Sequence, residues 1–160
     1  MRNLKHRKSR ERGSALIEIA VSYGVLVTIA VLTLKASVNA STAQMWTVKQ
    51  AMTDAFVTRE SALASRYPFD EVTGDSSLWA LYPSTSASTV TVGKLPGGAE
   101  VTAKLYRTRI PDSNNLPSAG GSGTSTTNPG GTEAWKLQSV LAYTVGDKEY
   151  VKTRTTLRTR

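Results

Sequence analysis

The amino-acid sequence predicts an α+β fold, with one long N-terminal helix packed on a four-stranded antiparallel sheet. Residues 14–66 contain no proline and a single glycine, Gly24, and they are rich in residues that favour helices. Four later segments, between 89 and 157, alternate apolar and polar side chains and are separated by breaks that contain glycine or proline. We therefore expect a helix over 14–66 and a β-rich globular domain over 67–160.

The first part of the predicted helix is long and apolar enough to cross a membrane. Its 21 residues from Ser14 to Leu34 include one charged side chain, Glu18, and Lys35 follows directly. At 1.5 Å per residue such a helix spans about 30 Å, the thickness of the hydrocarbon core of a bilayer. A carboxylate at the bilayer centre costs about 3 kcal/mol on insertion scales. A transmembrane segment over 14–35 therefore predicts that Glu18 has a partner.

A short basic segment precedes the apolar run. Residues 1–13 hold six Lys and Arg side chains against one acidic residue, Glu11. Basic residues beside a membrane span stay on the cytoplasmic side. The sequence therefore predicts a single span, with residues 1–13 in the cytoplasm and everything after Leu34 on the other side of the membrane.

Together, the basic segment, the glycine, the acid and the apolar run resemble the class III signal of type IV pilins and type II secretion pseudopilins. The match consists of Gly13, which ends the basic leader, and of Leu16, Ile17 and Glu18. The resemblance implies that a prepilin peptidase cuts after Gly13, and that Ser14 and Glu18 become the first and fifth mature residues. It also implies methylation of the Ser14 amine. Ser14 stands where Phe or Met is usual, and no proline interrupts the apolar helix.

This resemblance implies the pilin fold and a structural role without catalysis. The chain would be a subunit of a type IV pilus or of a type II secretion pseudopilus, joined to other pilin or pseudopilin subunits through its N-terminal helix. The expected location is the bacterial inner membrane and then the pilus or the periplasmic pseudopilus. The lack of cysteine and the character of the last strand, Tyr150–Arg160, favour a minor subunit, and the machine it serves stays open.

Two simpler interpretations of the N-terminal region also stay open. An ordinary secretory signal has an apolar core of roughly 7–15 residues followed by small residues at the cleavage site. The run here is longer and carries an acid, although Ala36, Ala40 and Ala43 resemble such a site. A single-span envelope protein that never polymerises would share the basic flank, but it would not explain Glu18.

The second part of the predicted helix, 36–66, is expected to be amphipathic. Five apolar residues recur at helical spacing and form a stripe able to cover a sheet, interrupted at Arg59: Met45, Val48, Met52, Phe56 and Leu63. Proline disfavours helix at the residue before it, so Pro68 ends the helix. Residues 67–87 contain glycine, prolines and many Ser and Thr side chains, and we expect them to be irregular.

The four predicted strands are 89–94, 99–109, 134–145 and 149–157, in each of which apolar residues occupy alternate positions. The segment 111–133 between the second and third strands is dense in Gly, Ser, Thr, Asn and Pro, and we expect a mobile surface loop. Its run Gly120–Gly123 lacks the Lys and Ser or Thr ending of a phosphate-binding loop and the helix that follows it. A phosphate site is therefore not expected.

Two rules disagree on how the last two strands pair. Gly146-Asp147 is typical of a two-residue type II′ turn, which sets Leu141 opposite Lys152 and places an apolar face beside a basic one. A three-residue loop instead sets Leu141 opposite Thr153, so that both apolar faces lie against the helix. Because each buried side chain is worth about 1.5–3 kcal/mol, we expect the longer loop, with Lys152 facing solvent.

Enzymatic chemistry is not expected. Cysteine is absent, and the only histidine, His6, lies in the leader, so the mature chain lacks Cys–His and Ser–His–Asp nucleophile sites and the usual zinc ligands. Asp70, Glu71 and Asp75 lie close together, and calcium binds such oxygens, as it does in some pseudopilins, but their spacing fits no known loop. The better interpretation is a solvated acidic turn, with no metal and no cofactor.

The net charge of +8 arises mostly in the leader, because the rest of the chain has 14 basic and 11 acidic residues. Basic side chains nevertheless gather around the last strand: Lys148, Lys152, Arg154, Arg158 and Arg160. This face leaves open a filament-tip module that binds DNA or a surface. We favour an edge strand that charge protects against unwanted pairing, so nucleic acid is not the expected partner.

Overall fold

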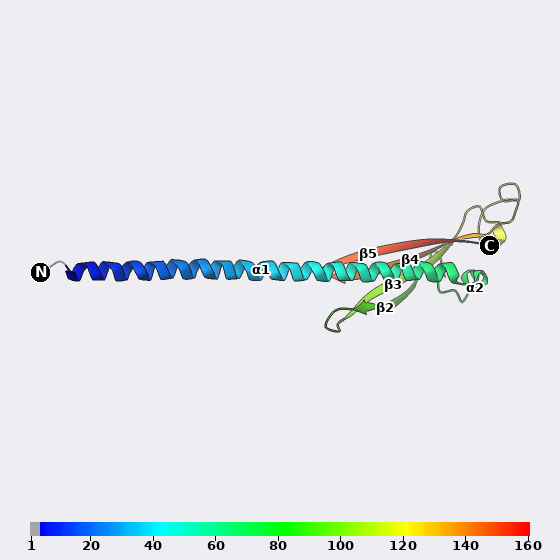
Figure 1. The fold of residues 1–160 in the computed structure, drawn as a ribbon. Coiled ribbons are helices and arrows are strands. Elements are labelled where there is room, and N and C mark those ends of the chain that lie inside the picture. The colour runs from blue at the N-terminus through cyan, green and yellow to red at the C-terminus, as the bar shows by residue number, and fades with distance from the viewer. Residues whose placement is uncertain (1–3) are drawn as a thin grey trace. The chain divides into compact units, whose positions relative to one another are not determined.

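The computed structural model describes the backbone of residues 4–160 and the side chains of residues 15–160 (Figure 1). The predicted leader, 1–13, and the residues at the predicted cleavage position, Gly13 and Ser14, lie outside the part that is described in full. The chain divides into two compact units, Met1–Met45 and Trp46–Arg160.

Helix α1 runs over Leu4–Arg66, and its last part belongs to the second unit. It ends where the sequence predicts, because Pro68 follows two residues later. The last turn is closed by the N–H of Tyr67, which donates to the carbonyl of Leu63 at 2.9 Å. Arg66 places a positive charge in this last turn, where the helix dipole favours it.

The second unit is an α+β domain, as the sequence predicts (Figure 1). Its elements after α1 are α2 (Phe69–Thr73), β1 (Ala80–Leu81), β2 (Ser86–Lys94), β3 (Glu100–Pro111), the 3₁₀ turn η1 (Pro117–Ala119), β4 (Ala134–Val145) and β5 (Lys148–Thr159). The four predicted strands correspond to β2, β3, β4 and β5. The β4 bounds agree with the prediction, and β2 begins three residues earlier than expected.

The sheet has five strands and is mixed, so the prediction of four antiparallel strands is wrong in this respect. β3 pairs antiparallel with β4 on one side and with β2 on the other, and β5 pairs antiparallel with β4. β1 runs parallel to the last part of β3. A strand of two residues is too short to show any alternation, so it could not be found within 67–87.

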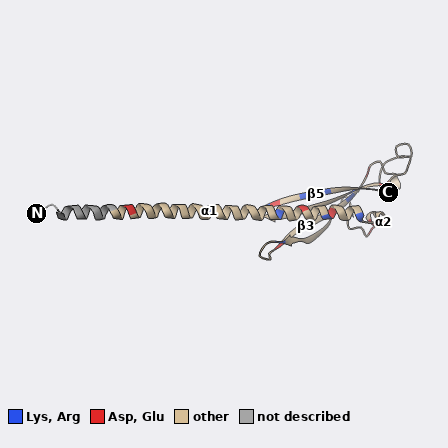
Figure 2. Ribbon diagram, in the orientation of Figure 1, with Lys and Arg blue, Asp and Glu red and all other residues tan. Residues whose placement is uncertain are grey.

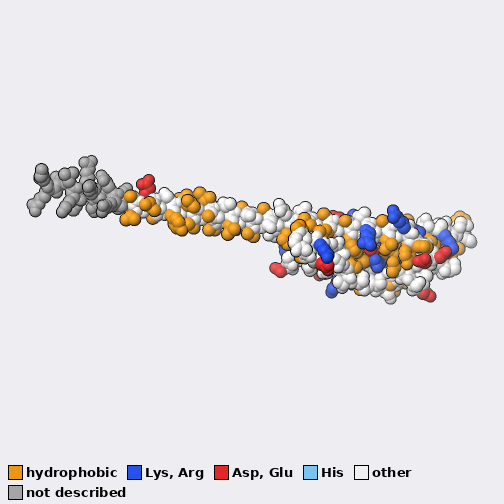
Figure 3. All heavy atoms as spheres, turned by 60° about the horizontal axis from the view of Figure 1, so that its bottom comes forward, with side chains coloured by type: hydrophobic (Ala, Val, Ile, Leu, Met, Phe, Trp, Pro, Cys, Tyr) orange, Lys and Arg blue, Asp and Glu red, His pale blue; other side chains and the backbone are white. Residues whose placement is uncertain are grey.

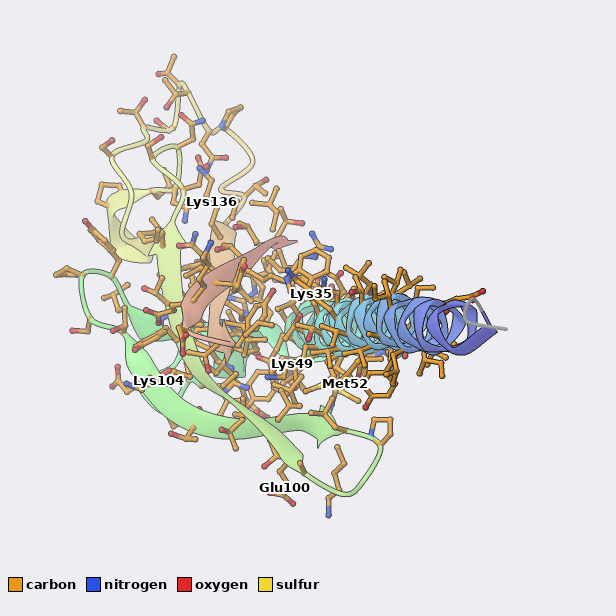
Figure 4. All side chains as sticks on the ribbon, turned by 90° about the vertical axis from the view of Figure 1, so that its left-hand side faces the viewer. Lys35, Lys49, Met52, Glu100, Lys104 and Lys136 are labelled. Atoms are coloured by element: carbon orange, nitrogen blue, oxygen red, sulfur yellow. The ribbon has the colours of Figure 1, made fainter. Side chains whose placement is uncertain are left out.

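The apolar core of this unit lies between α1 and the central strands. It consists of two clusters of buried residues: Val57, Ala103, Leu105, Leu141 and Tyr143, and Ala64, Val72, Trp79 and Leu137. The odd-numbered residues of β3 and β4 face α1, whereas even-numbered ones such as Lys104 point away from it (Figure 4). β5 adds only the half-buried Tyr150 to these clusters.

The face of α1 that packs on the sheet differs from the predicted apolar stripe. The buried residues are Thr53, Val57, Glu60 and Ala64, whereas Met45 and Leu63 of the stripe are exposed. Mostly short side chains on this face let the helix lie close to the sheet. The larger residues Met52 and Phe56 flank it, and Met52 reaches toward β2, where a Cβ at Gly93 would lie 3.1 Å from its sulfur (Figure 4).

The hairpin of β4 and β5 has the register that we did not expect. Leu141 lies opposite Lys152, and the pair Val145 and Lys148 flanks a two-residue turn. Gly146, the first turn residue, has φ of +61°, as a type II′ turn requires. The burial argument failed because the core lies over β3 and β4, so an inward apolar row on β5 would have gained little burial.

The segment 111–133 is held together by asparagine side chains. Asn115 is 1% exposed, and its amide donates to the carbonyl of Ala134 at 2.8 Å and accepts from the Ala134 N–H at 2.8 Å. The backbone packs closely here, since a Cβ at Gly121 would lie 2.1 Å from the Asn115 carbonyl oxygen. Asn128 binds the carbonyl of Thr132 in the same way, at 2.8 Å. The loop thus has a defined hydrogen-bonded packing.

Candidate functional site

The apolar part of α1 presents its side chains outward along its described length (Figure 3). Between Ala15 and Leu34 the large apolar residues are 42–70% exposed, from Val27 at the low end to Tyr23 at the high end. Among residues 15–160 this is the one helix long and apolar enough to cross a membrane. A surface of this kind needs lipid or other protein around it, because exposed apolar patches of this size are rare on soluble chains.

Two threonine hydroxyls of this segment are hydrogen-bonded within the helix. The Thr28 hydroxyl donates to the carbonyl of Gly24 at 2.8 Å, and the Thr33 hydroxyl donates to that of Ile29 at 2.8 Å. Such bonds remove the cost of an unpaired hydroxyl in hydrocarbon. The segment can therefore enter an apolar surrounding with these threonines in place.

Glu18 is the one acidic side chain of this segment, and it has no such bond among the residues described in full. It is the only acidic residue between Ala15 and Thr53, and charged residues are scarce over this range (Figure 2). It shares one face of α1 with Ala15, Ser22 and Leu26. Within residues 15–160 its carboxylate takes part in no ion pair or hydrogen bond, so a partner must come from elsewhere. Gly13 and Ser14, the predicted processing residues, lie outside the fully described part.

The acidic residues that could have held calcium do not converge. Asp70 and Glu71 lie on α2 and Asp75 follows it, and no group of three or more His, Cys, Asp or Glu residues in the described range is arranged to hold a metal ion. The Asp70 carboxylate instead accepts a hydrogen bond from the Arg160 guanidinium at 3.0 Å.

A buried polar cluster lies where α1 meets β3, and the sequence reasoning missed it. Arg107 donates to both oxygens of Glu60, from Nε at 2.8 Å and from Nη2 at 2.9 Å. The Arg107 guanidinium lies 5.6 Å from the ring centre of Trp79, whose indole N–H donates to Ser139 at 3.2 Å. Extending the odd-numbered alternation of β3 beyond Leu105 would have placed Arg107 on the inner face and called for an acid on α1.

Arg109, the next inward residue of β3, holds α2 against the sheet. It is buried, and its Nη1 donates to the carbonyls of Val72 and, at 2.7 Å, of Gly74. The guanidinium also lies over the ring of Trp135, at 5.7 Å. Burial lowers the pKa of Arg109, and the nearby Asp75 carboxylate acts in the opposite direction. Its contacts are those of a structural clamp.

The basic row of β5 faces α1, which contradicts the expectation that it faces solvent. Lys152 pairs with Asp54 at 2.7 Å and donates to the carbonyl of Gln50 at 3.0 Å. Arg158 donates to the carbonyls of Ala64 and Tyr67 at the end of α1, at 3.3 and 3.0 Å. Long basic side chains can cover a helix with their stems while their charged heads find partners at the rim.

This arrangement leaves few cations free for an anionic partner. Lys152, Arg158 and Arg160 are engaged by carboxylates or carbonyls. Of the five basic residues around the last strand, only Lys148 and Arg154 have no partner among the side chains described. The observation behind a DNA-binding face is therefore weaker than the sequence suggested.

Comparison of the chain with protein-family models, with curated proteins and with solved structures found no match. The functional conclusion therefore rests on the chain's own residues: an exposed apolar helix with one unpaired acid, followed by a well-packed α+β domain. Residues 15–160, the part described in full, contain neither histidine nor cysteine.

Proposed function

We propose that this chain is a pilin-like structural subunit of a type IV pilus or a type II secretion pseudopilus. The observation that carries the proposal is Glu18, a single unpaired carboxylate in an exposed apolar helix, placed five residues after the Gly13 that ends a basic leader. A plain membrane anchor has no use for such an acid, and its insertion is costly. A subunit that assembles through this helix does have a use for it.

In this proposal the precursor sits in the bacterial inner membrane with its basic leader in the cytoplasm. A prepilin peptidase cuts after Gly13 and methylates the Ser14 amine. Ser14 and Glu18 are four residues apart, about 6 Å along a helix. The new amine of one subunit can therefore reach the depth of the Glu18 carboxylate of its neighbour, and their pairing offsets the cost of burying each charge.

The α+β domain is the part of the subunit that lies outside the membrane, and it has a structural rather than an enzymatic role. Its charged residues form ion pairs and clamps between α1, α2 and the sheet, as Glu60 and Arg107 do. A minor rather than a major subunit is favoured by the absence of cysteine. The machine that the filament serves is best identified from the neighbouring genes.

The first test is the N-terminus of the mature protein. We expect it to begin at Ser14 when the precursor is expressed with a prepilin peptidase, and a Gly13→Leu variant to stay uncut, because only a small residue fits the peptidase site. Intact mass measurement distinguishes the two. Gly24→Leu, which lies outside the signal, should be cut normally. A mature chain that begins at Met1, or after Ala36 or Ala40, would contradict the assignment.

The second test is the role of Glu18. We expect Glu18→Ala to be inserted and cut normally but to be absent from sheared filaments, because the neighbouring amine has lost its partner. Immunoblots of the membrane and filament fractions measure this. Ser22→Ala, on the same face of α1, is the matched control and should be incorporated. If Glu18→Ala enters filaments at the normal level, the proposed pairing is wrong.

The alternatives make different predictions for the same experiments. A non-polymerising envelope protein is not cut after Gly13. A filament-tip module that binds DNA through the last strand is cut, and it binds duplex DNA with an affinity that falls steeply as salt is raised. Lys148 and Arg154 are the cations that would serve such a site, since the others on this strand are engaged.

A further inference from the structure

The two edges of the sheet differ in a way that points to a second binding site. β5 is hydrogen-bonded to β4 alone among the described strands, so its other edge is free over Lys148–Thr159. Unpaired backbone N–H and C=O groups along such an edge are a template for another strand.

Apart from its basic side chains, the free edge of β5 lacks the features that usually block an edge. Its pairing with β4 runs without interruption from Lys148 to Thr159, and it contains no proline, glycine or bulge. The opposite edge is interrupted: β2 contains Gly93 and is bulged between Thr91 and Gly93, and Pro83 lies in the connection that separates β2 from the two-residue β1. One edge is therefore interrupted, whereas the other is continuous and protected only by its charge.

The hairpin turn determines which backbone groups of β5 point to the free edge. A two-residue turn is closed by a hydrogen-bonded pair, here Val145 and Lys148, and such pairs recur at every second residue. The N–H of Arg160 donates to the carbonyl of Glu133 at 3.0 Å, which continues this even-numbered series. The odd-numbered residues from 149 to 157 therefore direct their backbone groups outward.

On both faces of the sheet, β5 has exposed side chains that an added strand could contact. On the face away from α1, Val151 and Leu157 are 61% and 59% exposed. On the face toward α1, Lys152 and Arg158 are turned onto the helix, where their partners hold them. Arg154, between them, is exposed and has no partner among the described residues.

A second copy of β5 is a poor occupant. Antiparallel pairing of two β5 strands within one sheet brings even-numbered residues beside even-numbered ones, because side chains alternate between the faces. When Val151 faces Leu157 of the other copy, Arg154 lies opposite Arg154. The basic row thus meets itself, and like charges across strands are destabilising. The positive charge of Arg154 instead favours an acidic partner strand.

We propose that the free edge of β5 is a strand-addition site for an extended acidic segment of a partner protein. The segment pairs with the outward backbone groups of residues 149–157, places an acidic side chain beside Arg154, and covers Val151 and Leu157 with apolar side chains on the other face. This is β-augmentation, in which backbone bonds supply affinity and alternate side chains supply specificity. The site does not depend on cleavage or on Glu18.

The test uses the full chain in detergent micelles and a blocked, fluorescently labelled peptide, as long as β5, in which valine alternates with glutamate. Anisotropy should show saturable binding that survives raised salt, because backbone hydrogen bonds contribute most of it. A peptide with lysine in place of glutamate should bind about two- to fivefold more weakly, by the usual strength of exposed ion pairs. If neither peptide binds, the proposal is wrong.

Two pairs of variants distinguish the contribution of the Arg154 charge to peptide binding from that of the backbone hydrogen bonds. Arg154→Glu should reverse the preference between the two peptides, whereas Arg59→Glu, at an exposed arginine on α1, should not. Thr153→Pro removes an outward N–H and should abolish binding of the glutamate peptide, whereas Thr153→Val keeps that N–H and should retain it. An unchanged preference in Arg154→Glu would overturn the assigned acidic contact.

Hydrogen exchange provides a readout that does not depend on folding of a variant. In the wild-type chain, adding the glutamate peptide should slow exchange at the amides of Val151, Thr153 and Thr155, while Lys152 and Arg154, already bonded to β4, change little. Peptide binding without this alternation would place the peptide elsewhere and overturn the proposal. A second outcome would also overturn the proposal. If duplex DNA binds this chain and displaces the peptide without protecting those amides, DNA is the preferred ligand.

Discussion

The two parts of α1 carry opposite kinds of surface. Over Ala15–Leu34 the large apolar side chains are exposed, while over 46–66 the residues that become buried are Thr53, Val57, Glu60 and Ala64. The apolar part has no cover within the chain that is described, and the more polar part lies under a sheet. Burial along this helix therefore follows from what is packed against it, and not from how apolar each residue is.

This contrast separates two kinds of requirement. The first part needs an apolar surrounding that the described chain does not supply. Its composition suits contact with lipid or with neighbouring helices. The second part needs a close fit to a sheet whose inner face carries Arg107 and Arg109, so it contributes small residues and one acid. Variants in the two parts should therefore differ in what they change.

The largest change in the free energy of unfolding is expected at the buried ion pair between Glu60 on α1 and Arg107 on β3. Arg107→Ala leaves Glu60 buried without its partner, and removing one member of a buried pair costs about 3–5 kcal/mol. Urea unfolding of the full chain in detergent, followed by tryptophan fluorescence, measures the loss, since Trp79 lies beside Arg107. Arg59→Ala, at an exposed site, should change little. Adding Glu60→Leu to Arg107→Ala should recover part of the loss.

A smaller change in the free energy of unfolding is expected when a leucine in the domain and a leucine in the apolar part of α1 are compared. Leu141 is fully buried between α1 and the sheet, so Leu141→Ala should lower the free energy of unfolding by about 3 kcal/mol. Leu26 on α1 is 66% exposed, and Leu26→Ala should leave that same unfolding transition unchanged. Equal shifts for the two variants would mean that the apolar segment is part of the folded domain, against the division after Met45.

The smallest effect compares two glycines. Gly146 adopts φ of +61° in the β4–β5 turn, so Gly146→Ala should destabilise the domain by about 1–3 kcal/mol through backbone strain. Gly24 lies in helix with nothing within 4 Å of an added Cβ, so Gly24→Ala should leave the domain's unfolding unaffected. Thermal melts followed by circular dichroism compare the two. A neutral Gly146→Ala would argue for a different turn.

Several elements could be predicted from local pattern alone. The helix end before Pro68, the apolar segment after Gly13 and the full extent of β4 each follow from residues close in sequence. The candidate site also belongs to this group, because Glu18 is conspicuous as one charge among apolar neighbours. These features depend on the conformational preference or the solvation of a short segment, which its own residues determine.

The remaining features depend on contacts between distant segments, and only the tertiary structure decided them. The pairing of Glu60 with Arg107, the short parallel strand β1 and the inward turn of Lys152 join parts of the chain far apart in sequence. The β4–β5 register shows the physical reason: Gly146-Asp147 favours the observed two-residue turn locally, but whether burial would override that turn depended on where α1 covers the sheet. By itself the sequence determined the end of the long helix, the four longer strands and the apolar segment, while packing decided the short elements and which faces meet.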